Sequence, residues 1–273
     1  MTKPRQREVP LSREDVDTIL THCGTEPLLV GGQALAFWAN HYGVAPPPPL
    51  AGAVTSDIDF LGLQAHARAL ARHLPEWQLV IAKMDDHGGQ AAKLYKSVED
   101  TVKQVDYLTS VVGLENDSLH ARAVTIELDD EVKFRVLHPL DLFESRLQNY
   151  RHLPSKRGPQ SRAQVAYALG VVSRYLAERI RERDSSRKLL DIAERIIQLA
   201  GQKPLLRACI ACGIDPLAAI PANRLGAPRF LAERWPRVLA ADQRLREAIA
   251  VEQARQAAVR MARSSGTRKP KRR

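Results

Sequence analysis

The sequence has few of the features that mark secreted or membrane-bound proteins. Three cysteines in 273 residues are too few for the disulfide framework of a small secreted protein. No apolar run approaches the roughly 20 residues of a transmembrane helix. Residues 1–5 (MTKPR) are not followed by the apolar core of a secretory signal. We therefore expect a cytoplasmic protein that has no membrane partner.

Cysteine pairs of the kind that bind structural zinc are also scarce in this sequence. Cys209 and Cys212 form one Cys-x-x-Cys pair inside a segment with a helical pattern, and there is no second such pair. A structural zinc site needs four ligands, so this pair alone cannot complete one. We expect both cysteines to be small side chains in the packing of a helix.

Charge is distributed unevenly along the chain. Residues 1–150 contain 14 Lys and Arg and 21 Asp and Glu, a balance of −7, whereas residues 151–273 contain 27 and 10, a balance of +17; together they give the net charge of +10. A basic half beside an acidic half indicates contact with a polyanion, in which Arg151, Lys156, Arg157 and Arg162 would border the mouth of a site. Arginine-rich helix faces exposed to solvent would give the same composition, so both interpretations stay open.

Glycines and carboxylates follow one another in an informative order in the first 106 residues. The apolar run 28–30 ends at Gly31 and Gly32, where a helical pattern begins. Asp57 and Asp59 are two residues apart in an apolar run, so on a strand both side chains leave by one face, and Asp106 lies in a later apolar run that can form a neighbouring strand. Carboxylates bind Mg²⁺ together with substrate phosphates, and a helix N-terminus that begins with glycine binds phosphate. These parts together predict a site for a nucleoside triphosphate and magnesium.

This order resembles the nucleotidyltransferase superfamily of DNA polymerase beta type, in which a Gly-Gly or Gly-Ser turn precedes an Asp-x-Asp and a third Asp on a following strand. Residues 31–36 (GGQALA) and 55–60 (TSDIDF) most resemble the minimal nucleotidyltransferases related to the abortive-infection toxins of bacteria. The resemblance covers about residues 11–155. It implies an α/β (α+β) nucleotidyltransferase core with a mixed sheet, followed by an all-helical C-terminal region.

The resemblance also implies roles for individual residues. Asp57, Asp59 and Asp106 would be the catalytic carboxylates and would hold two Mg²⁺ ions. In this family a helix that begins near a proline, here Pro139, carries a basic residue that faces the triphosphate. The residues that would contact the NTP are Gly31, Gly32, Gln33, Ser56 and Arg146.

The sequence departs from the family pattern in three places. Arg146 stands where lysine is usual, and Ala53 and Val54 replace a basic residue that often precedes the Asp-x-Asp. Four consecutive prolines, residues 46–49, are inserted between the glycines and Asp57. These departures concern the substrate more than the metal site.

The implied activity is Mg²⁺-dependent transfer of an NMP from an NTP to a hydroxyl acceptor, with release of pyrophosphate. Toxin-like action would make the acceptor RNA, especially a tRNA end, or a protein side chain, and a cognate antitoxin would be a partner. The basic second half favours RNA. Two alternatives stay open: a small-molecule nucleotidyltransferase of antibiotic-modifying type, and a non-catalytic protein that binds nucleotide or a partner.

Hydrophobic periodicity predicts a catalytic domain over residues 1–138, a basic helical domain over 139–263 and a disordered basic tail over 264–273. Ser12 is the expected N-cap of the first helix. Helices are expected at 11–22, 32–41, 64–73, 139–152, 162–183, 187–200, 203–212 and 228–263. Strands are expected at 28–30, 57–61, 77–82, 91–97, 102–108, 124–128 and 132–137, the last two as a hairpin.

Overall fold

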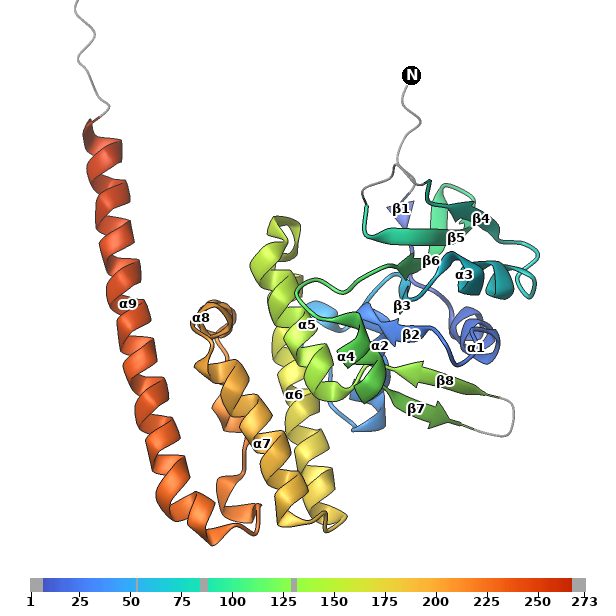
Figure 1. Ribbon diagram of the computed structural model, residues 1–273. Helices are drawn as coiled ribbons and strands as arrows, with labels where there is room; N and C mark the ends of the chain where they lie inside the picture. The colour runs from blue at the N-terminus through green and yellow to red at the C-terminus, as the bar shows by residue number, and fades with distance from the viewer. Residues whose placement is uncertain (1–6, 53, 84–87, 129–131, 267–273) are drawn as a thin grey trace, which may run out of the picture. The chain divides into compact units, whose positions relative to one another are not determined.

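The chain forms two compact units, residues 1–178 and 179–273. The computed structural model describes residues 7–52, 54–83, 88–128 and 132–266. The first unit contains a mixed β-sheet with helices, and the second is helical (Figure 1). The predicted α/β part followed by a helical part is therefore confirmed.

Seven strands form a continuous hydrogen-bonded sheet in the order β4-β5-β6-β3-β2-β8-β7. The strands are β2 (Leu28–Val30), β3 (Ile58–Leu61), β4 (Gln78–Ile81), β5 (Gln90–Val98), β6 (Thr101–Leu108), β7 (Val124–Glu127) and β8 (Lys133–Val136). A short eighth strand, β1 (Arg7–Glu8), pairs with the first residues of β6. The β3–β6 and β2–β8 pairs are parallel and the other pairs along the path are antiparallel, so the predicted mixed sheet is confirmed.

Each predicted strand is found, with ends that differ by at most one residue. The hairpin tip, residues 129–131, lies outside the described residues. Helix α4 was not predicted, because its seven residues carry only one buried apolar side chain, Leu119. The helices of the first unit are α1 (Arg13–His22), α2 (Gly31–His41), α3 (Gln64–Ala71), α4 (Asn116–Arg122), α5 (Pro139–His152) and α6 (Pro159–Arg181), with short 3-10 turns η1 (Pro48–Leu50) and η2 (Pro154–Lys156).

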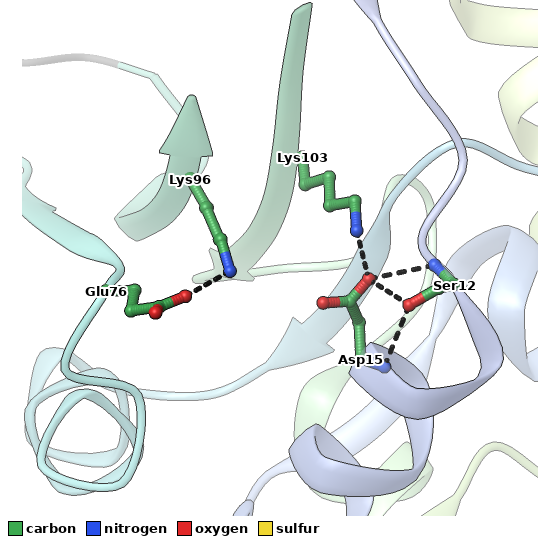
Figure 2. Close-up of polar contacts among 5 residues, drawn as sticks. All are labelled: Ser12, Asp15, Glu76, Lys96 and Lys103. Atoms are coloured by element: carbon green, nitrogen blue, oxygen red, sulfur yellow. Dashed lines mark hydrogen bonds and ion pairs between the residues drawn. The ribbon is translucent and has the colours of Figure 1, made fainter. Parts of the chain in front are cut away.

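Two ion pairs, Lys96–Glu76 and Lys103–Asp15, join β5 and β6 to neighbouring segments (Figure 2). Lys103 and Asp106 are three residues apart on β6, so these pairs lie on the face of the sheet away from Asp106. Lys96 on β5 lies directly opposite Lys103 on β6, a like-charge pair that destabilises a sheet unless each charge is neutralised. Lys96 pairs with Glu76, and Lys103 Nζ lies 2.5 Å from Asp15 Oδ2 on α1. Burial opposes ionisation of Asp15, but hydrogen bonds from Lys103 and Ser12 outweigh it and hold the pKa of Asp15 below its usual value.

Helix α1 begins as the sequence predicts. Ser12 Oγ accepts a hydrogen bond from the Asp15 backbone N–H, and the Asp15 carboxylate accepts one from the Ser12 backbone N–H. This reciprocal capping box satisfies two backbone donors that the helix itself leaves unpaired. The same aspartate therefore caps the helix, neutralises Lys103 and docks α1 on the sheet.

Aromatic side chains fill the core of the first unit. Phe60 on β3 stacks on Tyr107 of β6, with ring centroids 5.4 Å apart, and neither side chain is exposed. Trp38 of α2 packs beside the sheet and donates from Nε1 to the Leu137 carbonyl oxygen at 2.7 Å. These contacts fix the strand that carries Asp59 and the helix that begins at Gly31.

Helix α5 and all but the last three residues of α6 belong to the first unit. Gln164 on α6 donates to the Val54 carbonyl oxygen at 2.8 Å, and Tyr167 donates from its hydroxyl to the Val44 carbonyl oxygen at 3.0 Å. The division after residue 178 therefore falls later than the boundary expected at 138/139. The sequence pattern places the boundary where the strands end. The contacts place it later, because the first helices after the strands pack on the loops of the sheet and so belong to the first unit.

The second unit follows the predicted helices closely. The apolar spacing of Leu189, Ile192, Ile196 and Leu199 predicts one buried face of its first helix; Leu189, Ile196 and Leu199 are buried there, and Ile192 is half-buried. Cys209 is buried and Cys212 half-buried, and neither is part of a disulfide. The predicted tail 264–273 continues a helix as far as residue 266, and its remainder lies outside the described residues. The elements are α7 (Ser186–Gly201), α8 (Lys203–Cys212), two 3-10 turns η3 (Pro216–Ala219) and η4 (Ala222–Arg224), a π-helical turn η5 (Phe230–Arg234) and α9 (Trp235–Gly266).

Among the described residues, no single helix has the length and apolar character needed to cross a membrane. Two consecutive helical segments, Lys203–Cys212 and Pro216–Arg224, would together have the length and apolar composition of a membrane span, but they are bent by 83° relative to each other.

Candidate metal and nucleotide site

Three carboxylates meet at the centre of the sheet. Asp59 on β3 and Asp106 on β6 are direct partners in the parallel register, and Asp57 directly precedes β3. One carboxylate oxygen from each of the three lies within 4.8 Å of the others. The prediction that Asp57 and Asp59 stand side by side, with Asp106 on a neighbouring strand, is confirmed.

The closeness of these carboxylates makes them hard to ionise together. Burial raises the pKa of Asp59 to about 7, and the charges of Asp57 and Asp106 act in the same direction. Burial likewise raises the pKa of Asp106 to about 6, with Lys93 opposing the shift. A cation placed among the three would remove the repulsion and favour the ionised forms.

The two glycines bring the start of α2 against this cluster. Gly31 has φ +71°, and a β-carbon there would lie 2.0 Å from Asp59 Oδ2. A β-carbon at Gly32 would lie 2.4 Å from Thr55 Cβ. No side chain of the described residues caps the N-terminus of α2, so its first N–H groups and the positive end of its dipole are unpaired beside Asp59. The glycines begin a helix beside the carboxylates as predicted, and their contact with phosphate stays a prediction.

The loop before β3 is fixed by hydrogen bonds of its own. Thr55 Oγ1 donates to Asp57 Oδ1, and Gln164 of α6 holds the carbonyl of Val54. Ser56 Oγ lies 3.5 Å from Glu8 Oε2 on β1. Strand β1 pairs with the first residues of β6, so Ser56 lies near the start of the strand that carries Asp106. Gln33 is half-buried in the first turn of α2. Nucleotide contacts from Ser56 and Gln33 stay predictions.

Arg146 approaches the carboxylates from α5. Its Nε has no accessible surface and no hydrogen-bond partner among the described residues. Burial lowers the pKa of Arg146, while the charges of Asp59 and Asp57 act in the opposite direction. Lys156 in η2 is exposed, and its charge lowers the pKa of Asp59. The site therefore has a basic side, as the prediction for Arg146 requires.

Three polar side chains around Asp106 were not predicted. Gln90 Nε2 donates to Asp106 Oδ1 at 2.7 Å, and Lys93 Nζ lies 3.6 Å from the same oxygen. Gln104 Nε2 lies 3.5 Å from Asp106 Oδ2 and its Oε1 accepts a hydrogen bond from Lys93 at 3.0 Å. In the sequence, their only sign is that they are polar residues within apolar strand patterns. Their position beside Asp106 depends on the β5–β6 register, which the sequence pattern does not give.

The structure gives Arg157 a different role from the one expected. Its Nε donates to the Tyr150 carbonyl oxygen at 3.2 Å, and its NH2 group donates to that of Arg151 at 2.7 Å. These carbonyls belong to the last turn of α5, which lacks intrahelical donors for them. Arg157 therefore caps α5, and its contact with an acceptor stays a prediction. Lys156 in η2 and Arg162 near the start of α6 are both exposed.

No protein-family model matches this chain, and no curated protein is significantly similar to it in sequence. The resemblance to the nucleotidyltransferase superfamily therefore stays a prediction.

Proposed function

We propose that this protein is a Mg²⁺-dependent nucleotidyltransferase that moves an NMP from an NTP to a hydroxyl acceptor. The observation that carries the proposal is the cluster of Asp57, Asp59 and Asp106, with oxygens within 4.8 Å of one another, against the glycine start of α2. Carboxylates bind a cation, and free backbone N–H groups at a helix start bind phosphate, so the two side by side can hold a metal ion next to a polyphosphate.

The donor set suits magnesium. Asp57, Asp59 and Asp106 offer only carboxylate oxygens, the ligands that Mg²⁺ prefers, and two of them have raised pKa values because of burial and mutual repulsion. These three residues would hold the metal. When bound, Mg²⁺ would neutralise the triphosphate and stabilise the charge of the leaving group.

The remaining chemistry falls to side chains and backbone of this chain. The start of α2 and Arg146 would hold the triphosphate by hydrogen bonds and charge. The acceptor oxygen forms a bond to the α-phosphorus as the bond from that phosphorus to the β-bridging oxygen breaks. The acceptor proton passes to Asp106, and pyrophosphate leaves with the electron pair of the broken bond.

RNA, in particular a tRNA end, is the acceptor that the charge distribution favours. Residues 151–273 carry a balance of +17, and Lys156 lies close enough to Asp59 to affect its pKa. A toxin-like enzyme of this kind would be paired with an antitoxin. A protein side chain or a small molecule as acceptor is an outcome that the test below distinguishes.

The test uses each of the four NTPs labelled on the α-phosphate, incubated with the protein, Mg²⁺ and total cell extract. We expect label in RNA with wild type and none with Asp59→Asn, whose folded state is checked by circular dichroism. Label in protein or in small molecules would show that the acceptor is a protein side chain or a small molecule, not RNA. No transfer from any NTP, or undiminished transfer by Asp59→Asn, would contradict the catalytic proposal.

A further inference from the structure

Lys93 brings a positive charge to the carboxylate cluster from within the sheet. It is the direct cross-strand partner of Asp106, with its Nζ 3.6 Å from Asp106 Oδ1. Gln90 donates to the same oxygen at 2.7 Å. Asp106 Oδ1 therefore already has a cation and a hydrogen-bond donor, whereas Asp57 and Asp59 have no ion pair within the described residues.

The placement of Lys93 follows from the strand register. Side chains alternate between the two faces of a sheet, so Lys93 shares the face of Asp106, and Lys96, three residues later on β5, lies on the other face. Lys96 is occupied there with Glu76 (Figure 2). One strand thus carries two lysines, of which only Lys93 faces the carboxylates.

We propose that Lys93 is a positioning residue that takes the place of a metal cation at Asp106 in the nucleotide-free protein and competes with divalent metal for that carboxylate. This inference rests on the proposed function, because it concerns the same metal site. It assigns Asp106 a resting state in which one oxygen is held by the protein, and leaves Asp57 and Asp59 as the first ligands that an entering metal meets.

Charge explains what Lys93 would achieve. Three ionised carboxylates carry three negative charges, and Lys93 and Arg146 supply two positive ones. The cluster that remains attracts a free divalent ion weakly, whereas a metal bound to a triphosphate arrives with its own negative ligands for Arg146. The buried Arg146 Nε has no hydrogen-bond partner among the described residues, as expected of a guanidinium whose partner is a bound anion. Metal and nucleotide would therefore bind together.

Gln104 offers Lys93 a second partner. Lys93 Nζ donates to Gln104 Oε1 at 3.0 Å while it stands beside Asp106. The ammonium group can therefore turn from Asp106 to Gln104 without losing all its polar contacts when metal enters. Its side chain is 33% exposed, which leaves water to solvate it after the move.

The experiment measures Mn²⁺ binding to the full-length protein by electron paramagnetic resonance of the free ion, without nucleotide. We expect Lys93→Met to bind Mn²⁺ about tenfold more tightly than wild type, because it removes a positive charge close to the metal site, and the partial exposure of Lys93 limits the gain to about that size. Lys93→Arg keeps the charge and should retain wild-type affinity. Lys96→Met, which removes the same charge from the opposite face, is the matched control and should leave the affinity unchanged.

The outcomes separate this inference from the proposed function. If Asp59→Asn abolishes Mn²⁺ binding while Lys93→Met binds no more tightly than wild type, the Lys93 inference is wrong and the metal site stands. Equal tightening in Lys96→Met would also overturn it, because the effect would then be one of general charge. If wild type and every variant fail to bind Mn²⁺, even with a non-reactive NTP analogue, the proposed function fails together with the inference. Thermal unfolding of each variant shows whether the fold is retained.

Discussion

Gly31 and Asp59 are in such close contact that a β-carbon on residue 31 would overlap the carboxylate, at 2.0 Å from Oδ2. Gly31 also has φ +71°, a conformation in which other residues are strained. Two separate constraints therefore require glycine at this position: the backbone conformation that starts α2 and the close approach of the helix to the Asp59 carboxylate.

Gly31→Ala should separate these two constraints when compared with Gly24→Ala. Gly24 has φ +74°, and a β-carbon added there would meet nothing within 4 Å, so its alanine variant suffers backbone strain alone. We expect both variants to lose about 1–2 kcal/mol of unfolding free energy from that strain. Only Gly31→Ala should lose Mn²⁺ binding and NMP transfer, because only there is the carboxylate displaced. Equal transfer activity in the two variants would show that the contact with Asp59 does not matter for the site.

Asp59→Asn should stabilise the protein while it abolishes transfer. The pKa of Asp59 is raised to about 7 by burial and by the neighbouring Asp57 and Asp106, so its ionised form is unfavourable in the folded, metal-free protein. An amide removes that charge without changing the size of the side chain. Chemical denaturation at about pH 8 in the presence of a chelator should give a higher unfolding free energy for the variant, by a few kcal/mol at most. A less stable variant would contradict the electrostatic account.

The stability of the metal-free protein should fall as pH rises toward neutrality. The folded-state pKa values of Asp59, about 7, and Asp106, about 6, lie above the ordinary aspartate value near 3.9, so the folded state holds these protons more tightly than the unfolded state. Their contribution is fully present below about pH 4 and is lost as pH rises through about 6 to 7. Mg²⁺ should restore stability above that range and have little effect below it. Urea titrations across pH, with and without Mg²⁺, measure both effects; the Asp59→Asn protein should show a smaller slope.

The acidic site was predictable from sequence because its geometry depends on short-range rules. Asp57 and Asp59 are two residues apart at the start of an apolar strand, so alternation alone places them together. Gly31 and Gly32 stand where an apolar run changes to a helical period. Asp106 needed only the assumption that two apolar runs become neighbours, which the β3–β6 pairing fulfils.

The surroundings of Asp106 depended on information that local patterns do not contain. Lys93 and Gln90 face Asp106 only because β5 and β6 pair in one register, with an irregularity between Gln90 and Ala92. A shift by one residue would have placed Lys93 on the other face. The capping role of Arg157 likewise depends on where the chain turns after α5, at a distance of six or seven residues from the carbonyls that it holds.

Arg146→Met should weaken NTP binding more than it affects the fold. The guanidinium lies near Asp59 and Asp57, and its buried Nε has no partner among the described residues. Methionine keeps much of the side-chain volume and removes the charge and donors, so we expect about a tenfold or greater rise in the dissociation constant of an NTP analogue. Arg146→Lys should retain part of the affinity, since lysine also binds phosphate as a point charge. Unchanged affinity in Arg146→Met would remove Arg146 from the nucleotide site.

Lys156→Ala and Arg157→Ala should give opposite results, although the residues are adjacent and both basic. Arg157 donates to two carbonyls at the end of α5, so its removal should lower stability by about 1 kcal/mol or more. Lys156 is exposed and its charge reaches Asp59, so its removal should leave stability unchanged and weaken RNA binding.

A lost phosphate contact reduces the slope of log affinity against log salt by about one. RNA binding by the full-length protein across a salt series measures this slope, with Lys133→Ala, at an exposed lysine paired with Glu127 on the β7–β8 hairpin, as the control for general charge. If Lys156→Ala keeps the wild-type affinity and slope, RNA is not held at this side of the carboxylates, and a protein or small-molecule acceptor becomes the better explanation.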